Sequence, residues 1–307
     1  MNKIRVSLDG EGFRDKPTSE TISKISSRIG ESTVELSSIS DDMKKFALVV
    51  GDGGCTFCPA AFKDGKRSKD HFEQQQFIAL DFDNKEQDRR ISLEELKTRA
   101  KKYNLPILFA YDTFSSTEHD KFRVVFLNDA SIYHRKITEA TQLALGMIFP
   151  EADSSCYRDV SRMYYGGKEL LYCNDSIPTI NVESVFRGLT YYLQDTKGNH
   201  YKEWLSKFSR ETGIALNKNG LLDVTVTDNL TESLGATQPN QNGKFSPSPI
   251  INIPVNIIAN GEIFRNKFYR INLSDSTNKS SVTKSVNRTD LVDREYKNHG
   301  AYRSSVL

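Results

Sequence analysis

Apolar and polar residues follow two different periods along this chain, and these periods predict strands and helices. Residues 4–8 alternate with period two, and the run 77–80 is wholly apolar, which is typical of a buried strand. Further strands are expected at 107–111 and 121–127, with a shorter one at 34–36. The pattern therefore predicts a folded part that mixes strands with helices.

Five stretches have the apolar spacing of amphipathic helices. One begins at Ser92-Leu93-Glu94-Glu95, a capping box in which the Ser and the last Glu satisfy each other's backbone N–H groups, and it ends near Asn104. Because it lies between two predicted strands, a parallel crossover is a possible connection. The other four stretches are 17–29, 131–149, 181–193 and 199–211.

The regular pattern stops near Asp228. From there Asn, Ser, Thr, Gln and Pro dominate, and Ser246-Pro247-Ser248-Pro249 is typical of a linker. We therefore predict that 228–307 is a disordered basic and polar tail or linker. Its small excess of Lys and Arg from Gly261 onward either helps to hold nucleic acid or keeps the tail solvated.

Three classes of protein are disfavoured by the whole sequence. A net charge of +2 over 307 residues excludes a uniformly basic protein, although a basic cleft remains possible. No apolar run approaches the ~18 residues of a membrane span, and residues 1–5 have no signal core, so we expect a cytoplasmic protein with no membrane partner. The turn Gly51-Asp52-Gly53-Gly54 lacks the Gly-Lys-Ser/Thr ending of a P-loop.

The chain has four cysteines. Cys55 and Cys58 have the spacing of half a zinc site, but no second close pair follows them. Cys156 and Cys173 would complete a site only if the fold brought them there. We therefore expect ordinary buried thiols and no zinc.

Asp81-Phe82-Asp83 closes the apolar strand and carries the clearest chemistry. Because side chains alternate across a strand, Asp81 and Asp83 share one face, while Phe82 packs on the other. Two carboxylates ~7 Å apart along a strand suit a divalent cation between them, and Mg²⁺ prefers oxygen ligands. The alternative is a strand that ends in solvated acids before a turn at Asn84.

Two groups of cations lie near these acids in the sequence. Lys121 and Arg123 share a strand face after a polar loop, which indicates an anion-binding surface or exposed charges on an edge strand. The stretch 62–69 precedes the acidic strand and suits a site that binds phosphates, or else a solvated loop. Its cations are Lys63, Lys66, Arg67 and Lys69.

A third acid, Asp153, follows the predicted helix 131–149. It is either another metal ligand or a loop acid that caps a helix. The segment after it is rich in polar and aromatic groups, includes Arg162, and is expected to end in a strand and turn near Gly167.

The order of these pieces resembles the archaeo-eukaryotic primase superfamily, most of all the primase-polymerases of plasmids, phages and other mobile elements. The resemblance covers about residues 40 to 175. Asp81 and Asp83 match the first motif, hydrophobic-Asp-hydrophobic-Asp, and Asp153 matches the third, a lone metal-binding Asp. The second motif, Ser-x-His, falls at the loop 115–119. There the chain departs from the family, because Thr117-Glu118-His119 supplies Thr-x-His instead.

The resemblance implies an α+β fold, in which an RNA-recognition-like sheet with flanking helices lies next to a small N-terminal α/β unit. The catalytic domain is then expected at 1–195, a helical extension at 196–227 and the tail at 228–307. The implied activity is that of a nucleotidyltransferase, a DNA primase or DNA polymerase that uses two metal ions on a single-stranded DNA template. The expected setting is the replication of a mobile element.

The resemblance also implies roles for single residues. Asp81, Asp83 and Asp153 are the expected catalytic residues and hold two Mg²⁺ or Mn²⁺ ions. The aromatic residues of the region either stack on template bases or belong to the core; they are Phe57, Phe62, Tyr164 and Tyr165. Together with the strand-face argument for Lys121, the expected nucleotide-binding residues are Ser115, Ser116, His119, Lys121, Arg123 and Arg162. The basic stretch 62–69, by its position before the acids, supplies the expected DNA-binding residues Lys63, Lys66, Arg67 and Lys69.

The implied partners are single-stranded DNA, NTPs or dNTPs, and a replicative helicase in a separate chain or in a missing C-terminal region. Two other functions remain as alternatives: a non-catalytic module that binds single-stranded DNA or a replication origin, and a metal-dependent nuclease. Binding of a nucleoside triphosphate separates the nuclease from the primase-polymerase. Priming and primer extension stay equally open, as do NTPs and dNTPs.

Overall fold

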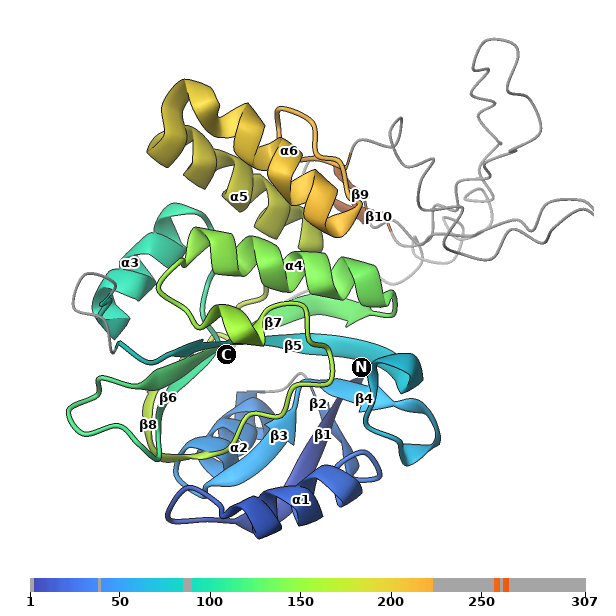
Figure 1. The fold of residues 1–307 in the computed structure, drawn as a ribbon, viewed down its shortest axis with the longest axis vertical. Coiled ribbons are helices and arrows are strands. Elements are labelled where there is room, and N and C mark those ends of the chain that lie inside the picture. Colours follow the sequence, from blue (N-terminus) through green and yellow to red (C-terminus); the bar gives the residue numbers. More distant parts are fainter. Residues whose placement is uncertain (1–2, 38–39, 85–89, 223–256, 260–261, 265–307) are drawn as a thin grey trace, which may run out of the picture. The chain divides into compact units, whose positions relative to one another are not determined.

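The structure is a computed structural model that describes residues 3–37, 40–84, 90–222, 257–259 and 262–264 (Figure 1). Contacts divide the chain into two units, Met1–Ala236 and Thr237–Leu307. In the second unit, β9 (Ile257–Ala259) and β10 (Glu262–Phe264) form an antiparallel pair. The rest of the predicted tail at 228–307 lies outside the described residues. No helix in the described ranges has the length and apolar character needed to cross a membrane.

A five-stranded sheet forms the centre of the first unit. Its strand order is β4-β5-β7-β6-β8, and every neighbouring pair is antiparallel. Consequently β5 and β6 run in the same direction with β7 between them, so the expected crossover passes over one strand. The strands are β4 (Ala60–Phe62), β5 (Phe72–Phe82), β6 (Phe109–Thr113), β7 (Phe122–Ile132) and β8 (Gly167–Cys173).

Helices cover one face of this sheet (Figure 1). They bury the alternate strand residues that include Leu80, Phe82, Phe122 and Val124, as the period of two predicts. The capping box at Ser92 is confirmed, because Ser92 Oγ accepts from Glu95 N at 3.2 Å and Glu95 Oε2 accepts from Ser92 N at 2.9 Å. The helices are α3 (Leu93–Lys102), α4 (Arg135–Ile148), α5 (Val182–Lys197) and α6 (Tyr201–Thr212).

Two sequence boundaries differ from the structure. The helix expected at 131–149 begins only at Arg135, because β7 continues to Ile132 and uses the first residues of that stretch. The expected boundary at 195/196 falls inside α5. Leu205, Phe208 and Ile214 beyond it are buried in the same hydrophobic cluster as the central sheet.

The other face of the sheet is covered by the N-terminal part of the chain. A three-stranded antiparallel sheet has the order β2-β1-β3. The apolar run 46–50 belongs to helix α2, where Phe46 stacks on Phe77 of β5 with ring centroids 5.1 Å apart. These elements are β1 (Lys3–Gly12), α1 (Ser19–Arg28), β2 (Thr33–Ser37), α2 (Ser40–Gly51) and β3 (Cys55–Cys58).

A crossing segment, residues 153–166, joins the two layers. Tyr164 exchanges two backbone hydrogen bonds with Phe57 of β3, and its hydroxyl donates to Ala79 O of β5 at 3.0 Å. The segment thereby passes beside the end of β5, where the predicted acids lie. Short 3₁₀ turns are η1 (Lys63–Gly65), η2 (Lys69–His71), η4 (Ser154–Cys156) and η5 (Gly198–His200).

Candidate active site

Three side chains form a row across the sheet near the end of β5. Asp81 is the register partner of Arg123 on β7, and Arg123 is the partner of Tyr111 on β6. Phe82 and Phe122, one position further along, belong to the helix-covered face. The row therefore lies on the face toward the N-terminal layer, as the alternation rule predicts for Asp81.

Asp81 and Arg123 form a two-point ion pair. Arg123 Nε lies 3.1 Å from Asp81 Oδ1, and Nη2 donates to Oδ2 at 3.2 Å. The guanidinium also donates to Tyr165 O and lies near the rings of Tyr111 and Tyr164, 5.9 and 5.6 Å from their centroids. Burial lowers the pKa of Arg123, but the charge of Asp81 and the interactions with Tyr111 together outweigh it, and the net shift is upward. Arg123 is therefore a fixed cation that holds Asp81 in place.

Asp153 is held beside Asp81 by the backbone. Its N–H donates to Asp81 O at 2.7 Å, and its carboxylate accepts from Ser155 N at 2.9 Å and Ser155 Oγ at 2.7 Å. Burial raises the pKa of Asp153, but the hydrogen bonds from Ser155 and the charge of Arg162 outweigh it, so the net shift is downward. Asp153 is thus both a cap of η4 and a carboxylate kept in its charged form.

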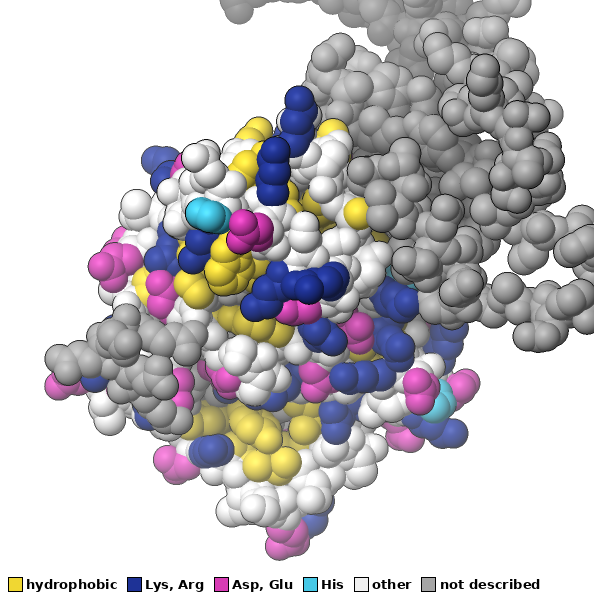
Figure 2. All heavy atoms as spheres, turned by 45° about the horizontal axis from the view of Figure 1, so that its top comes forward, with side chains coloured by type: hydrophobic (Ala, Val, Ile, Leu, Met, Phe, Trp, Pro, Cys, Tyr) yellow, Lys and Arg dark blue, Asp and Glu magenta, His cyan; other side chains and the backbone are white. Residues whose placement is uncertain are grey.

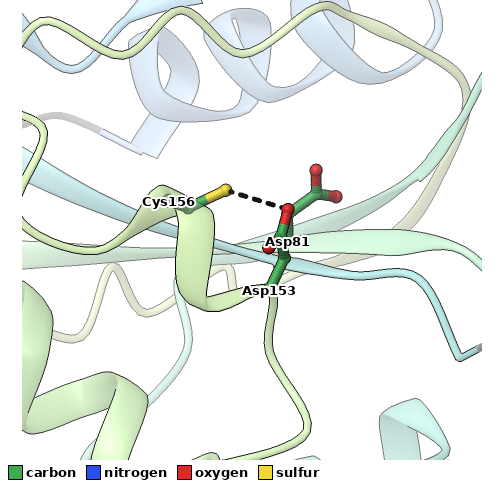
Figure 3. A group of neighbouring side chains, drawn as sticks. All are labelled: Asp81, Asp153 and Cys156. Carbon is green, nitrogen blue, oxygen red and sulfur yellow. Dashed lines mark hydrogen bonds between the residues drawn. The ribbon is translucent and has the colours of Figure 1, made fainter.

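Asp81, Asp153 and Cys156 bring one possible ligand atom each within 4.8 Å of one another (Figure 3). The Cys156 thiol points at Asp153 and lies 3.8 Å from Oδ2. Burial raises the pKa of Cys156 to about 12, so the thiol is neutral near pH 7. Cys156 was not expected at the site, because nothing in the local sequence distinguishes it from an ordinary buried thiol. The two carboxylates are the ligands suited to a hard divalent cation.

Asp83 follows the end of β5 and is less closely bound to this group. Its side chain is 38% exposed, and Lys121 Nζ lies 3.5 Å from its Oδ1. It is not among the ligand atoms that lie within 4.8 Å of one another. Asp83 and Lys121 therefore form a second charged pair next to Asp81 and Arg123.

A cavity of about 380 Å³ connects these residues. All three predicted acids line it, as do the expected nucleotide-binding residues Ser115, Lys121, Arg123 and Arg162. Lys16, from the loop before α1, also lines it and was not predicted, since only the folding of the N-terminal layer brings it there. Figure 2 shows Lys and Arg side chains interspersed with Asp and Glu on one face of the molecule, not a uniformly basic surface. The charge is thus locally mixed, with four cations and three acids around the cavity.

The structure places Ser116 and His119 away from this cavity. Ser116 is buried and its hydroxyl donates to Asp112 Oδ1 at 3.1 Å, while His119 Nδ1 lies 2.6 Å from Asp112 Oδ2. Asp112 is the register partner of Phe122, so it lies on the helix-covered face of the sheet. His119 lines a different cavity of about 580 Å³, next to Ser92 and Glu95 of the α3 N-terminus.

The basic stretch 62–69 divides into two kinds of cation. Arg67 is partly buried and donates to Ser161 O at 2.6 Å and to Ser26 Oγ at 2.5 Å, so it ties α1 to the crossing segment. Lys69 Nζ donates to Arg158 O at 3.3 Å, while Lys63 and Lys66 are exposed. None of the four is among the residues that line the 380 Å³ cavity at Asp81.

Three of the four aromatic residues considered for base stacking belong to the core. Phe57, Phe62 and Tyr164 are 0, 4 and 2% exposed, so the stacking role is wrong for them. Phe57 and Tyr164 stack on each other with ring centroids 5.6 Å apart. Tyr165 is half-buried and lines the cavity.

Comparisons with known proteins find little. No protein-family model and no curated protein matches the chain. Among solved structures, the chain is similar to the AEP domain of the cyanophage S-2L primase-polymerase (PrimPol), with 12% identity and a TM-score of 0.32. That match covers 51% of this chain and 79% of the other. A similarity of this size does not assign the chain to a family.

Proposed function

We propose that this protein is a nucleotidyltransferase that extends or initiates a strand on a single-stranded DNA template, as a primase-polymerase. The observation that carries the proposal is the carboxylate pair Asp81 and Asp153, which shares one cavity with four Lys and Arg side chains. The sequence motifs that resemble the archaeo-eukaryotic primase superfamily support the same reaction. They also supply its proposed setting, which is the cytoplasmic replication of a mobile element.

The donor set of the cavity suits Mg²⁺ or Mn²⁺. Asp81 and Asp153 offer charged oxygens, and Asp83 lines the same cavity, whereas the neutral Cys156 thiol is a poor ligand for a hard ion. Two divalent ions bound there would make the primer 3′-hydroxyl a better nucleophile and neutralise the leaving pyrophosphate. Arg123 orients Asp81 for this role, and Ser155 keeps Asp153 charged.

The cations of the cavity suit a triphosphate. Lys121 directly precedes β7, Arg162 lies in the crossing segment, and Lys16 comes from the N-terminal layer, so they approach the cavity from separate segments. Positive groups fixed around phosphate oxygens offset the charge that develops during transfer. The Ser115 hydroxyl is exposed at the cavity and can donate a further hydrogen bond.

The template is proposed to pass the cavity at Tyr165. A base stacked on that ring would gain about 1–3 kcal/mol. The exposed cations Lys63 and Lys66 lie outside the cavity and suit phosphates of the DNA strand. The further partners of this proposal are NTPs or dNTPs and a replicative helicase, in a separate chain or in a further part of this one.

Two other functions use some of the same residues. A metal-dependent nuclease would need the acids but not four cations around one cavity, and a non-catalytic module would need neither acid of the close pair. Binding and cleavage assays separate the three. The proposal expects a non-hydrolysable nucleoside triphosphate to bind with Mg²⁺, and expects end-labelled single-stranded DNA to stay intact in the same buffer.

The test uses calorimetry with matched variants. Lys16→Ala and Arg162→Ala should each weaken triphosphate binding about tenfold, and Lys207→Ala serves as the control because Lys207 lies on α6, away from the cavity. Metal-dependent DNA degradation without triphosphate binding would replace the proposal by a nuclease. DNA binding with neither activity would replace it by a binding module.

A further inference from the structure

A second group of possible metal ligands lies on the other face of the central sheet. Asp112 on β6 and Glu169 on β8 are register partners, and His119 comes from the loop between β6 and β7. One ligand atom of each lies within 4.8 Å of the others. Three separate segments thus bring an imidazole and two carboxylates to one point.

Asp112 is a buried acid with little compensating charge. Its side chain is 2% exposed, and it accepts hydrogen bonds from Ser116 and His119. Within the described ranges, no Lys or Arg forms an ion pair with it. A buried carboxylate is costly unless a cation or several donors satisfy it. Among the described residues, the imidazole of His119 is its partner at the shortest distance, 2.6 Å.

Glu169 adds a second negative charge to the same point. It is exposed on β8, the edge strand of the sheet. Across the part of the chain that the structure describes, its side chain has no hydrogen-bond or ion-pair partner. Two carboxylates that share one imidazole repel each other, and a divalent cation between them removes that repulsion. The unpaired carboxylate of Glu169 is therefore placed to coordinate an ion together with Asp112 and His119.

We propose that Asp112, His119 and Glu169 bind one transition-metal ion of the Zn²⁺ class. One nitrogen and two carboxylate oxygens suit Zn²⁺, Co²⁺ or Mn²⁺ better than Mg²⁺. This donor set is distinct from the cysteines at 55 and 58, which are buried thiols. Solvent water completes the coordination on the exposed side of Glu169.

Binding of the ion displaces one proton. His119 Nδ1 and Asp112 Oδ2 are 2.6 Å apart, a distance bridged by a hydrogen. Metal–ligand bonds of ~2.1 Å at a tetrahedral centre separate two ligand atoms by roughly 3.4 Å. The pair therefore opens by less than ~1 Å, the Nδ1 proton leaves to solvent, and the metal takes its place.

A metal ion at this site would fix the position of the loop between β6 and β7 and would take no part in the proposed nucleotidyl transfer. It ties His119 to both β6 and β8, and the same loop begins with residues that line the active-site cavity. The row Asp112–Phe122 and the row Tyr111–Arg123–Asp81 face opposite sides of the sheet. A metal at one centre is thus separated from the other by the sheet itself.

Nuclear magnetic resonance of the full chain, with ¹⁵N-labelled histidine, tests the proposal directly. The chain has five histidines, and none of the four within the described ranges lines the cavity at Asp81. Stepwise Zn²⁺ should shift the ring nitrogens of His119 with a stoichiometry of one, while equal Mg²⁺ should not. Ions bound at Asp81 and Asp153 do not produce this signal, so its failure and that of the proposed function are distinguishable.

Glu169→Gln is the decisive variant, because an exposed and unpaired side chain can be replaced without unfolding the protein. It should lower the Zn²⁺ affinity, measured from the shift of the His119 ring nitrogens, by about 100-fold or more. Glu203→Gln is the matched control, because Glu203 also lies beside a histidine, with Oε1 3.1 Å from His200 Nδ1. Among the described residues this pair has no third ligand, so the variant should leave the Zn²⁺ affinity at His119 unchanged. An unshifted His119 at saturating Zn²⁺, or equal affinity in Glu169→Gln, overturns the proposal.

Discussion

Asp81 and Arg123 face each other across β5 and β7, and two guanidinium nitrogens lie 3.1 and 3.2 Å from the two carboxylate oxygens. Both side chains are largely buried, at 19 and 10% exposure. A proposed metal ligand is therefore also half of a buried ion pair. Any cation that binds Asp81 shares this carboxylate with Arg123.

Replacing Arg123 should lower the free energy of unfolding, because Arg123 is half of a largely buried ion pair. Arg123→Ala leaves Asp81 and Tyr165 O without their donor, and we expect the free energy of unfolding to fall by about 3 kcal/mol. Arg123→Lys keeps the charge but loses the planar two-point contact, so it should cost less. Urea unfolding measures both. An Arg123→Ala protein as stable as the parent would mean that the ion pair contributes nothing in solution.

The three acids should differ in their effect on the metal requirement of nucleotide incorporation. We expect Asp81→Asn and Asp153→Asn to lower the rate by about 100-fold or more, because they remove the close pair of carboxylates. Asp83→Asn should act mainly by raising the Mg²⁺ concentration needed for half-maximal rate. Asp70→Asn, an acid with 91% exposure, is the control. A larger loss in Asp83→Asn than in the other two would move the metal centre to Asp83.

The stability of the protein should depend on the charge of Asp153 in acid. Its pKa is lowered in the folded chain, so the unfolded chain binds the proton more readily. This contribution is fully present above the unfolded value of ~3.9 and is lost as pH falls through the folded value below it. The difference between the unfolding free energies of the parent and Asp153→Asn should therefore shrink as the pH is lowered from 7 toward 3. A constant difference would contradict the charged role.

The cations of the stretch 62–69 should separate into structural and DNA-binding residues. Arg67→Ala should lower the free energy of unfolding by about 2 kcal/mol, because it removes two hydrogen bonds from a charged donor. The exposed pair Lys63→Ala and Lys66→Ala should leave stability within about 0.5 kcal/mol. It should instead weaken single-stranded DNA binding and flatten its salt dependence. If the Arg67→Ala protein kept the parental stability and lost only DNA affinity, Arg67 would be a DNA-binding residue and not a structural one.

Local rules account for the parts of the site that lie on single elements. Strand alternation places Asp81 opposite to Phe82 and puts Lys121 with Arg123, and both pairings agree with the structure. The capping box at Ser92 is a local hydrogen-bond pattern, so the sequence predicts it as well. These features need no knowledge of strand order.

The parts that the sequence could not predict depend on contacts between distant segments. The insertion of β7 between β5 and β6 decides that Asp81 meets Arg123, and no local pattern encodes it. The loop after β6 spans the end of the sheet, so Ser115 and His119 reach different cavities although they are four positions apart. Arg67 stands in a polar, basic stretch that is typical of an exposed loop. Only its contacts with α1 and the crossing segment make it partly buried.

Primer extension by the purified full chain is the direct test of nucleotidyl transfer at Asp81 and Asp153. The substrate is a primed single-stranded DNA template with labelled NTPs or dNTPs, in the presence of Mg²⁺ or Mn²⁺ and with a chelator as the reference. We expect template-dependent incorporation by the parent and by Asp70→Asn, and none by a folded Asp81→Asn/Asp153→Asn double variant. Incorporation by the double variant at the parental rate, or none by the parent with either metal, would contradict this expectation.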